Sequence, residues 1–152
     1  MKLQIASRLA IYALLDLAAH PDTQVSVAEI SEKYGISTHH LAKVMHTLGR
    51  ANLVRAVRGA GGGYQFSGNA KRTTLLEIVQ LFESFAQEGD EQSGPGSDTE
   101  TDRALRQVLD EIDDIARATL GSITIATMLN LVDAHRLSDR DERDREITAS
   151  QI

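Results

Sequence analysis

Residues 26–50 read SVAEISEKYGISTHHLAKVMHTLGR, and this stretch decides the fold. Ser26 and Glu29 form a capping box, in which a hydroxyl and a carboxylate satisfy the free backbone N–H groups at the start of a helix. Gly35 favours the left-handed cap that ends this short helix, and Ser37 is a fresh N-cap for the next one. Two short helices joined through a glycine-containing turn predict a helix-turn-helix.

The second of these helices, expected over residues 37–51, has two different faces. Its apolar side chains recur with the period of one helical face, at Leu41, Val44, Met45 and Leu48. The opposite face carries imidazole, cationic and small polar groups, which can contact base edges and phosphates in the major groove of DNA. We expect DNA contacts from the following residues of this helix: Ser37, Thr38, His39, His40, Lys43, His46, Thr47 and Arg50.

A glycine-rich hairpin is expected directly after this helix. Residues 53–58 are β-branched and basic, residues 59–63 read GAGGG, and residues 64–66 read YQF. Two short strands around such a tip predict a hairpin. Its glycines allow the backbone to approach DNA closely, and an arginine at its base suits a narrow minor groove. The wing contacts are therefore expected at Arg58, Gly61 and Gly62.

The distribution of charge supports a surface that binds phosphates. The net charge is −6, but residues 1–85 hold nine Lys and Arg against six Asp and Glu, a net charge of +3. Residues 86–152 hold seven against sixteen, a net charge of −9. Residues 33–72 contain seven Lys and Arg and no carboxylate. A stretch so depleted in acid is the electrostatic pattern of a nucleic-acid interface.

The remaining chain completes a winged helix-turn-helix domain over residues 1–85, mainly helical with a small β-hairpin wing. A first helix is expected over residues 7–20, and Thr74 with Glu77 forms a second capping box. We expect a flexible acidic loop over 86–99, a dimerisation helix over 100–122, a terminal helix over 123–135 and a disordered tail over 136–152. The dimerisation helix carries an apolar stripe at heptad-like spacing: Leu105, Val108, Leu109, Ile112 and Ile115.

Residues 30–37 (ISEKYGIS) and 57–64 (VRGAGGGY), in this order and at this distance, resemble the Rrf2 family of bacterial regulators, the relatives of IscR and NsrR. The resemblance covers about residues 1–135. It implies a cytosolic, homodimeric transcription factor, often a repressor, with one winged helix-turn-helix in each subunit. By this resemblance, the DNA contacts fall on Ser37, His39, His40, Lys43 and Arg58. Two-fold symmetry further predicts a pseudo-palindromic operator on double-stranded DNA.

The sequence departs from this family in its cofactor ligands. Many members hold an iron–sulfur cluster through three cysteines before the dimerisation helix, whereas this chain contains no cysteine. His39 and His46 lie about 10 Å apart along their helix axis, which is too far for a shared metal. We therefore expect no cofactor and no metal site. A cysteine-free member would respond to an unidentified effector or partner protein; engineered removal of cysteines is the alternative.

Other functional classes fit the sequence less well. The apolar run at residues 9–15 is too short to span a membrane and is followed by Asp16, so neither a signal peptide nor membrane association is expected, and the cytoplasm is the expected location. Gly59 and Gly61 precede a strand, which excludes a dinucleotide loop, and no catalytic motif indicates an enzyme. The alternative function is a protein–protein adaptor that uses the winged-helix scaffold without binding DNA.

Overall fold

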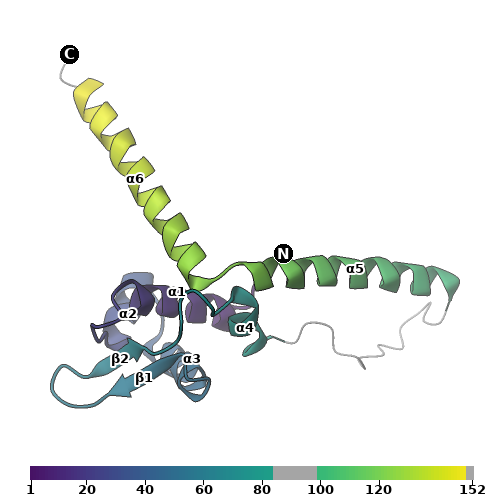
Figure 1. Cartoon of the computed structure of the whole chain (residues 1–152), viewed down its shortest axis with the longest axis horizontal. Coiled ribbons are helices and arrows are strands. Elements are labelled where there is room, and N and C mark those ends of the chain that lie inside the picture. The colour runs from purple at the N-terminus through teal and green to yellow at the C-terminus, as the bar shows by residue number, and fades with distance from the viewer. Residues whose placement is uncertain (84–98, 150–152) are drawn as a thin grey trace.

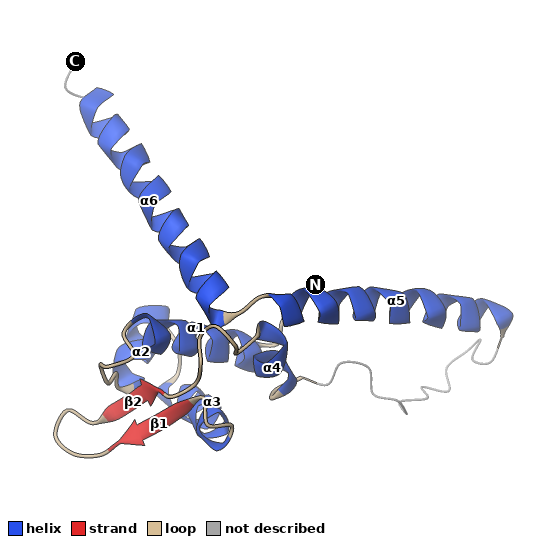
Figure 2. Ribbon diagram, viewed as in Figure 1, coloured by secondary structure: helices blue, strands red, loops and turns tan. Residues whose placement is uncertain are grey.

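The computed structural model describes residues 1–83 and 99–149. A helical domain with a two-stranded hairpin carries two long helices that leave it in different directions (Figure 1). The mainly helical fold with a small hairpin is the predicted fold class, which is therefore confirmed (Figure 2). The elements are α1 (Ile5–Ala19), α2 (Val27–Tyr34), α3 (Thr38–Arg50), β1 (Val54–Val57), β2 (Gly63–Phe66), α4 (Leu75–Gln80), α5 (Glu100–Ser122) and α6 (Ile125–Ala149).

The predicted caps define the helix-turn-helix. The Ser26 hydroxyl accepts a hydrogen bond from the Glu29 backbone N–H at 3.1 Å, and the Glu29 carboxylate accepts one from the Ser26 N–H at 2.7 Å. The bond from the Ser26 backbone N–H to the carboxylate, and then hydrogen bonding from the Ser26 side chain to it, favour the charged form and lower the pKa of Glu29. Gly35 ends α2 at φ +65°, in the left-handed region that favours glycine. Ser37 caps α3 through the His40 N–H.

The core of the domain lies between α1 and α3. The stripe predicted on α3 is buried, with Leu41, Val44, Met45 and Leu48 at most 2% exposed. It packs against α1, whose small and apolar residues face the same core. Burial of a leucine or methionine side chain stabilises the fold by about 1.5–3 kcal/mol. This packing fixes α3 so that its polar face points outward.

The hairpin is joined by a third extended segment. Strands β1 and β2 pair antiparallel, with Arg55 opposite Gln65 and Val57 opposite Gly63. On the other edge of β2, Val25 and Tyr64 exchange two backbone hydrogen bonds of 2.9 and 2.8 Å. The segment before α2 is therefore tied directly to the wing, and the position of the hairpin relative to α2 is set by backbone contacts.

The start of α4 connects the domain to the two long helices. Thr74 and Glu77 form the second predicted capping box, and the apolar face of α4 is buried in the domain core. The Leu75 N–H donates to the Ile123 carbonyl at 2.9 Å, and the Ile125 N–H donates to the Thr73 carbonyl at 3.0 Å. The junction between α5 and α6 is thus fastened to the domain.

One predicted element is wrong. The tail expected to be disordered over 136–152 is helical as far as Ala149, because α6 continues through it. The alternating charges are spaced as on an exposed helix, with Asp139 four residues before Arg143 and Asp141 four before Arg145, a spacing that supports helices. Helix α5 has the bounds expected for it, whereas the predicted acidic loop over 86–99 lies outside the described residues apart from residue 99.

Among the described residues, no helix combines the length and the apolar character that crossing a membrane requires.

Candidate nucleic-acid interface

The outer face of α3 presents nearly all of the predicted recognition residues to solvent. The structure places His39, Lys43, His46 and Arg50 on this face, opposite the buried stripe. Thr47 alone is half-buried, and its hydroxyl donates to the Lys43 carbonyl at 3.3 Å. The other predicted residues of this helix are all exposed: Ser37, Thr38, His39, His40, Lys43, His46 and Arg50.

The wing lies beside α3, at the lower edge of the domain in Figure 1. Its tip depends on glycine, since Gly59 and Gly61 have φ values of +115° and +74°. At Gly62 a Cβ atom would lie 2.6 Å from the Val57 carbonyl oxygen, so a larger residue does not fit this turn. Arg58, at the start of the tip, is exposed. The predicted wing residues Arg58, Gly61 and Gly62 therefore lie together in one tight loop.

Arg55 is a basic residue of this surface that sequence reasoning left out of the site. It is exposed on β1, and its Nε and Nη2 atoms donate to the Gln65 side-chain oxygen at 3.1 and 2.8 Å. Gln65 in turn donates to the Asp22 carbonyl at 3.1 Å. The signal in the sequence was the acid-free stretch over 33–72, which already contains Arg55. Its register opposite Gln65 became visible only in the structure.

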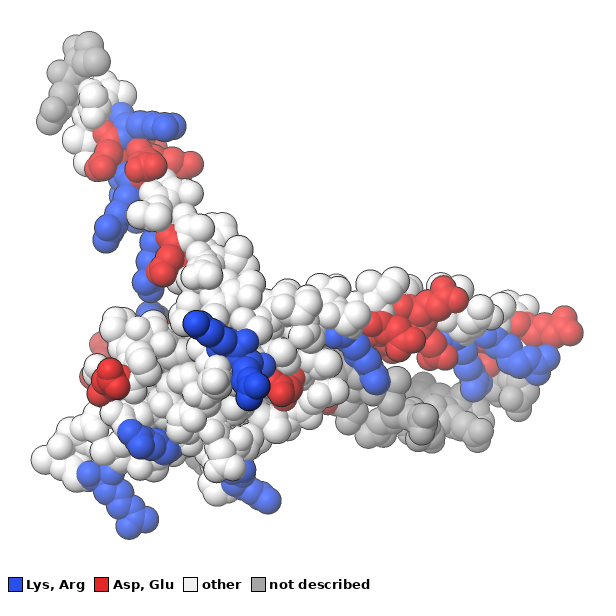
Figure 3. All heavy atoms as spheres, in the orientation of Figure 1, with Lys and Arg blue, Asp and Glu red and all other residues white. Residues whose placement is uncertain are grey.

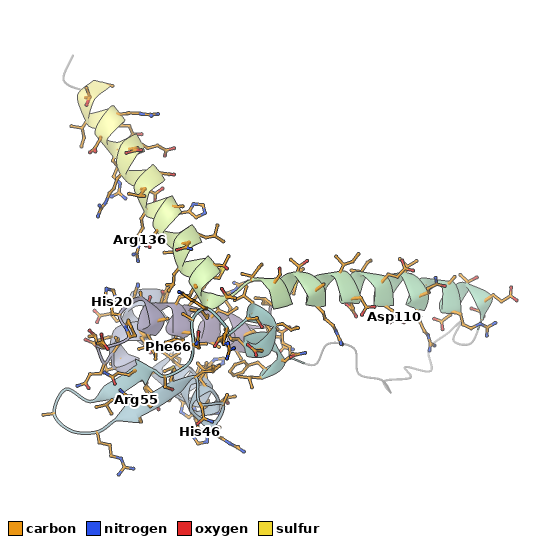
Figure 4. The ribbon with its side chains drawn as sticks, viewed as in Figure 1. His20, His46, Arg55, Phe66, Asp110 and Arg136 are labelled. Atoms are coloured by element: carbon orange, nitrogen blue, oxygen red, sulfur yellow. The ribbon has the colours of Figure 1, made fainter. Side chains whose placement is uncertain are left out.

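The charge of the surface follows the same division as the sequence. Figure 3 shows Lys and Arg side chains at the lower edge of the domain, over the wing and α3, whereas Asp and Glu side chains are mixed with basic ones along α5 and α6. No acidic residue lies in the first turn of α3, and Arg50 lies in its last turn. Figure 4 places His46 on the outer side of α3 and Arg55 on strand β1 of the wing. The arrangement can contact a polyanion along one edge of the domain.

A second surface, on α5, is apolar and uncovered in the single chain. Leu120 is the one buried residue among those of α5. The five residues of the predicted dimerisation stripe are between 50% and 67% exposed: Leu105, Val108, Leu109, Ile112 and Ile115. A continuous apolar stripe of this kind marks an interaction surface.

The iron–sulfur cluster that the family resemblance implies does not fit the donor atoms of this chain. Such clusters need thiolate ligands, and the sequence contains no cysteine. Over residues 1–83 and 99–149, no three His, Asp or Glu side chains come together in a group that could hold a metal ion. The described residues therefore offer no ligand set for an iron–sulfur cluster.

Comparisons with known proteins agree with this geometry. Residues 3–131 match the Rrf2 family, described as an iron-dependent transcriptional regulator. BadM of Rhodopseudomonas palustris, named as an HTH-type transcriptional regulator, is 49% identical over 136 residues, which cover 90% of this chain and 86% of BadM. The HTH-type transcriptional regulator IscR of Pectobacterium atrosepticum is 30% identical over 155 residues, which cover 99% of this chain and 92% of IscR.

A solved structure gives the same result. CymR of B. subtilis, titled a global cysteine regulator, superimposes with a TM-score of 0.70 at 25% identity, over 86% of this chain and 98% of CymR. These relatives are named as regulators and not as enzymes, and none of them supports the adaptor alternative. The chain belongs to the Rrf2 family and is a DNA-binding transcriptional regulator with a winged helix-turn-helix.

Proposed function

We propose that the protein is a cytoplasmic homodimer that represses transcription by binding a pseudo-palindromic operator in double-stranded DNA. The observation that carries this proposal is the outer face of α3, which is exposed, free of carboxylates and adjacent to a glycine-rich wing. A helix enters the major groove most readily when its outward face carries donors and cations and its inward face is anchored in a core.

Within this proposal, the residues of α3 divide into two roles. Ser37, Thr38, His39 and His40 lie at the start of the helix and contact base edges, because recognition helices place their N-terminal residues deepest in the groove. Lys43, His46, Thr47 and Arg50 lie further along and contact phosphates or the edge of a guanine. Arg58 enters the minor groove, and Gly61 and Gly62 let the backbone approach the sugar–phosphate chain.

The homodimer is proposed from α5. Its exposed stripe of five leucine, valine and isoleucine side chains is matched by an identical stripe on a second copy of the chain, which a two-fold interface requires. Pairing would remove these side chains from water on both subunits. The two α3 helices would then address half-sites about one or two helical turns apart.

Binding-site selection with wild-type protein and two variants tests the division of roles. His39→Ala should relax the sequence preference at one position in each half-site, with a loss of about 1–3 kcal/mol there. Arg50→Ala should instead weaken all sequences alike and reduce the dependence of binding on salt by about one unit per lost phosphate contact.

Arg145→Ala is the matched control, because this arginine lies near the end of α6, outside the α3 and wing surface. It should leave both the preference and the affinity unchanged. Identical preferences for wild type and His39→Ala would show that this face of α3 does not read bases. If the wild-type protein enriches no sequence, the proposal that it binds a specific operator is wrong.

A further inference from the structure

A hollow of about 510 Å³ lies where α6 crosses the ends of α1 and α2. This volume falls within the range of about 300–1,000 Å³ that small-molecule sites occupy. Its apolar wall comes from Ile11 and Leu15 on α1 and from Met128, Leu129 and Val132 on α6. Figure 4 shows His20 at the end of α1 and Arg136 on the lower part of α6, on either side of this gap.

One end of the hollow is polar, and its single deep carboxylate already has partners. Asp16 is 17% exposed and accepts hydrogen bonds from Lys33 Nζ at 2.7 Å and from the Tyr34 hydroxyl at 2.8 Å. The Tyr34 ring stacks on Tyr12, with the ring centroids 4.9 Å apart. Burial, and then the bond to Asp16, raises the pKa of Tyr34, so this hydroxyl stays protonated as a donor. The charge of Asp16 is therefore balanced from within the protein.

Arg136, on α6, is a cation of this lining with donors to spare. In the part of the chain that the structure describes, its ion-pair partner is Asp133, at 3.5 Å, and the two side chains are 63% and 68% exposed. Exposed pairs of this kind contribute little, and a guanidinium carries five N–H groups in a planar fork that matches a carboxylate. His20 lines the same hollow. The side chains of Arg136 and His20 are thus exposed donors at the edge of the hollow, beside its apolar wall.

We propose that this hollow binds a small organic carboxylate with an apolar body, its carboxylate on Arg136 and its body against the α1 and α6 side chains. The hollow adjoins the helix-turn-helix directly. Lys33 and Tyr34 form the last turn of α2, and only Gly35 to Ser37 separate them from α3. A ligand held between α1 and α6 therefore lies next to the last turn of α2, which leads into α3. Any change that the ligand causes in DNA affinity rests on the function proposed above.

Calorimetric titration of the full chain with small molecules tests the hollow in the absence of DNA. A negative result would therefore count against this ligand site and not against the proposed function. The probes are hexanoate, octanoate, 3-phenylpropanoate and 4-phenylbutyrate, with octanamide and acetate as matched compounds that lack the charge or the body. We expect saturable binding of at least one carboxylate probe, one per protomer. Octanamide, which lacks the charge, and acetate, which lacks the apolar body, should each bind more weakly than octanoate, by about tenfold or more.

Variants locate the binding. Arg136→Gln should weaken binding of the carboxylate probe by about tenfold. Val132→Phe, which fills the hollow, should abolish binding. Arg140→Gln, one turn further along α6 and outside the hollow, should leave binding unchanged. With ¹³C-methyl-labelled methionine, the Met128 resonance should shift on titration, whereas Met1, which does not line the hollow, should not.

Two results would overturn the proposal. The first is the absence of saturable binding for all four carboxylates at millimolar concentration. The second is binding that survives both Arg136→Gln and Val132→Phe, since the ligand would then occupy another surface, such as the apolar stripe of α5.

Discussion

Replacing Ile112 by aspartate tests the apolar stripe of α5, because this side chain is 55% exposed in the single chain and lies within the stripe. Covering the exposed half of an isoleucine contributes about 1 kcal/mol, and a desolvated carboxylate costs several kcal/mol when no partner compensates it. A two-fold dimer contains the substitution twice, once in each subunit, so the cost is doubled. The free energy of dimer dissociation should therefore fall by more than about 4 kcal/mol, which raises the dissociation constant about a thousandfold or more.

Sedimentation velocity over a range of protein concentrations measures this change. Gln107→Asp is the matched control, because residue 107 lies about 140° around α5 from Ile112, away from the stripe. It removes the hydrogen bond from Gln107 to Glu111 but should leave the dimer intact. Circular dichroism shows whether each variant stays folded. If the monomer is unstable, the thermal midpoint of the wild type should rise with protein concentration. A folded Ile112→Asp variant with the dissociation constant of the wild type would refute the α5 interface.

Three further outcomes follow from the fold. Gly63→Ala should lower the free energy of unfolding by about 1–3 kcal/mol, because the new Cβ would lie 2.5 Å from the Val25 carbonyl oxygen. Gly49→Ala is the control, since its Cβ meets nothing within 4 Å and should not destabilise the protein. Equal melting points for the two variants would contradict this packing. The pKa of Glu29 is lowered in the folded protein, so its charged carboxylate stabilises the fold fully at pH values above 4.5, the pKa of the unfolded chain. This stabilisation is lost as the pH falls through the lower pKa of the folded protein. The difference in melting temperature between wild type and Glu29→Gln should therefore shrink as the pH is lowered through this range. Reconstitution with iron and sulfide should leave the protein colourless, since the chain has no thiolate; stoichiometric iron with visible absorbance would contradict this expectation.

Local signals predicted the helix-turn-helix closely. The capping box of Ser26 and Glu29, the left-handed Gly35 and the N-cap at Ser37 depend on neighbouring residues alone, so they are legible in the sequence. The stripe on α3 has an unambiguous helical period, and its buried face fixes the exposed one. The exposure of the candidate DNA residues followed from this geometry, whereas their contacts with DNA stay predictions.

Features that depend on distant residues were not predictable. The bridge between Val25 and Tyr64 joins segments 39 positions apart, and neither carries a local signal for it. Asp16 indicated only that the first helix was not a signal peptide; its role as acceptor for Lys33 and Tyr34 emerged from packing. The charged end of α6 was misread because alternating charges occur both in disordered segments and on exposed helices.

The central claim is that α3 and the wing hold DNA through cations of both subunits, and the salt dependence of binding to duplex DNA tests it most directly. Lys43, Arg50 and Arg58 are exposed on this surface, so the proposed dimer would bring about six cations against the DNA, along α3 and at the minor groove. Counterion release then predicts that the logarithm of the association constant falls with the logarithm of salt concentration with a slope of about −5. A slope near zero would contradict the account.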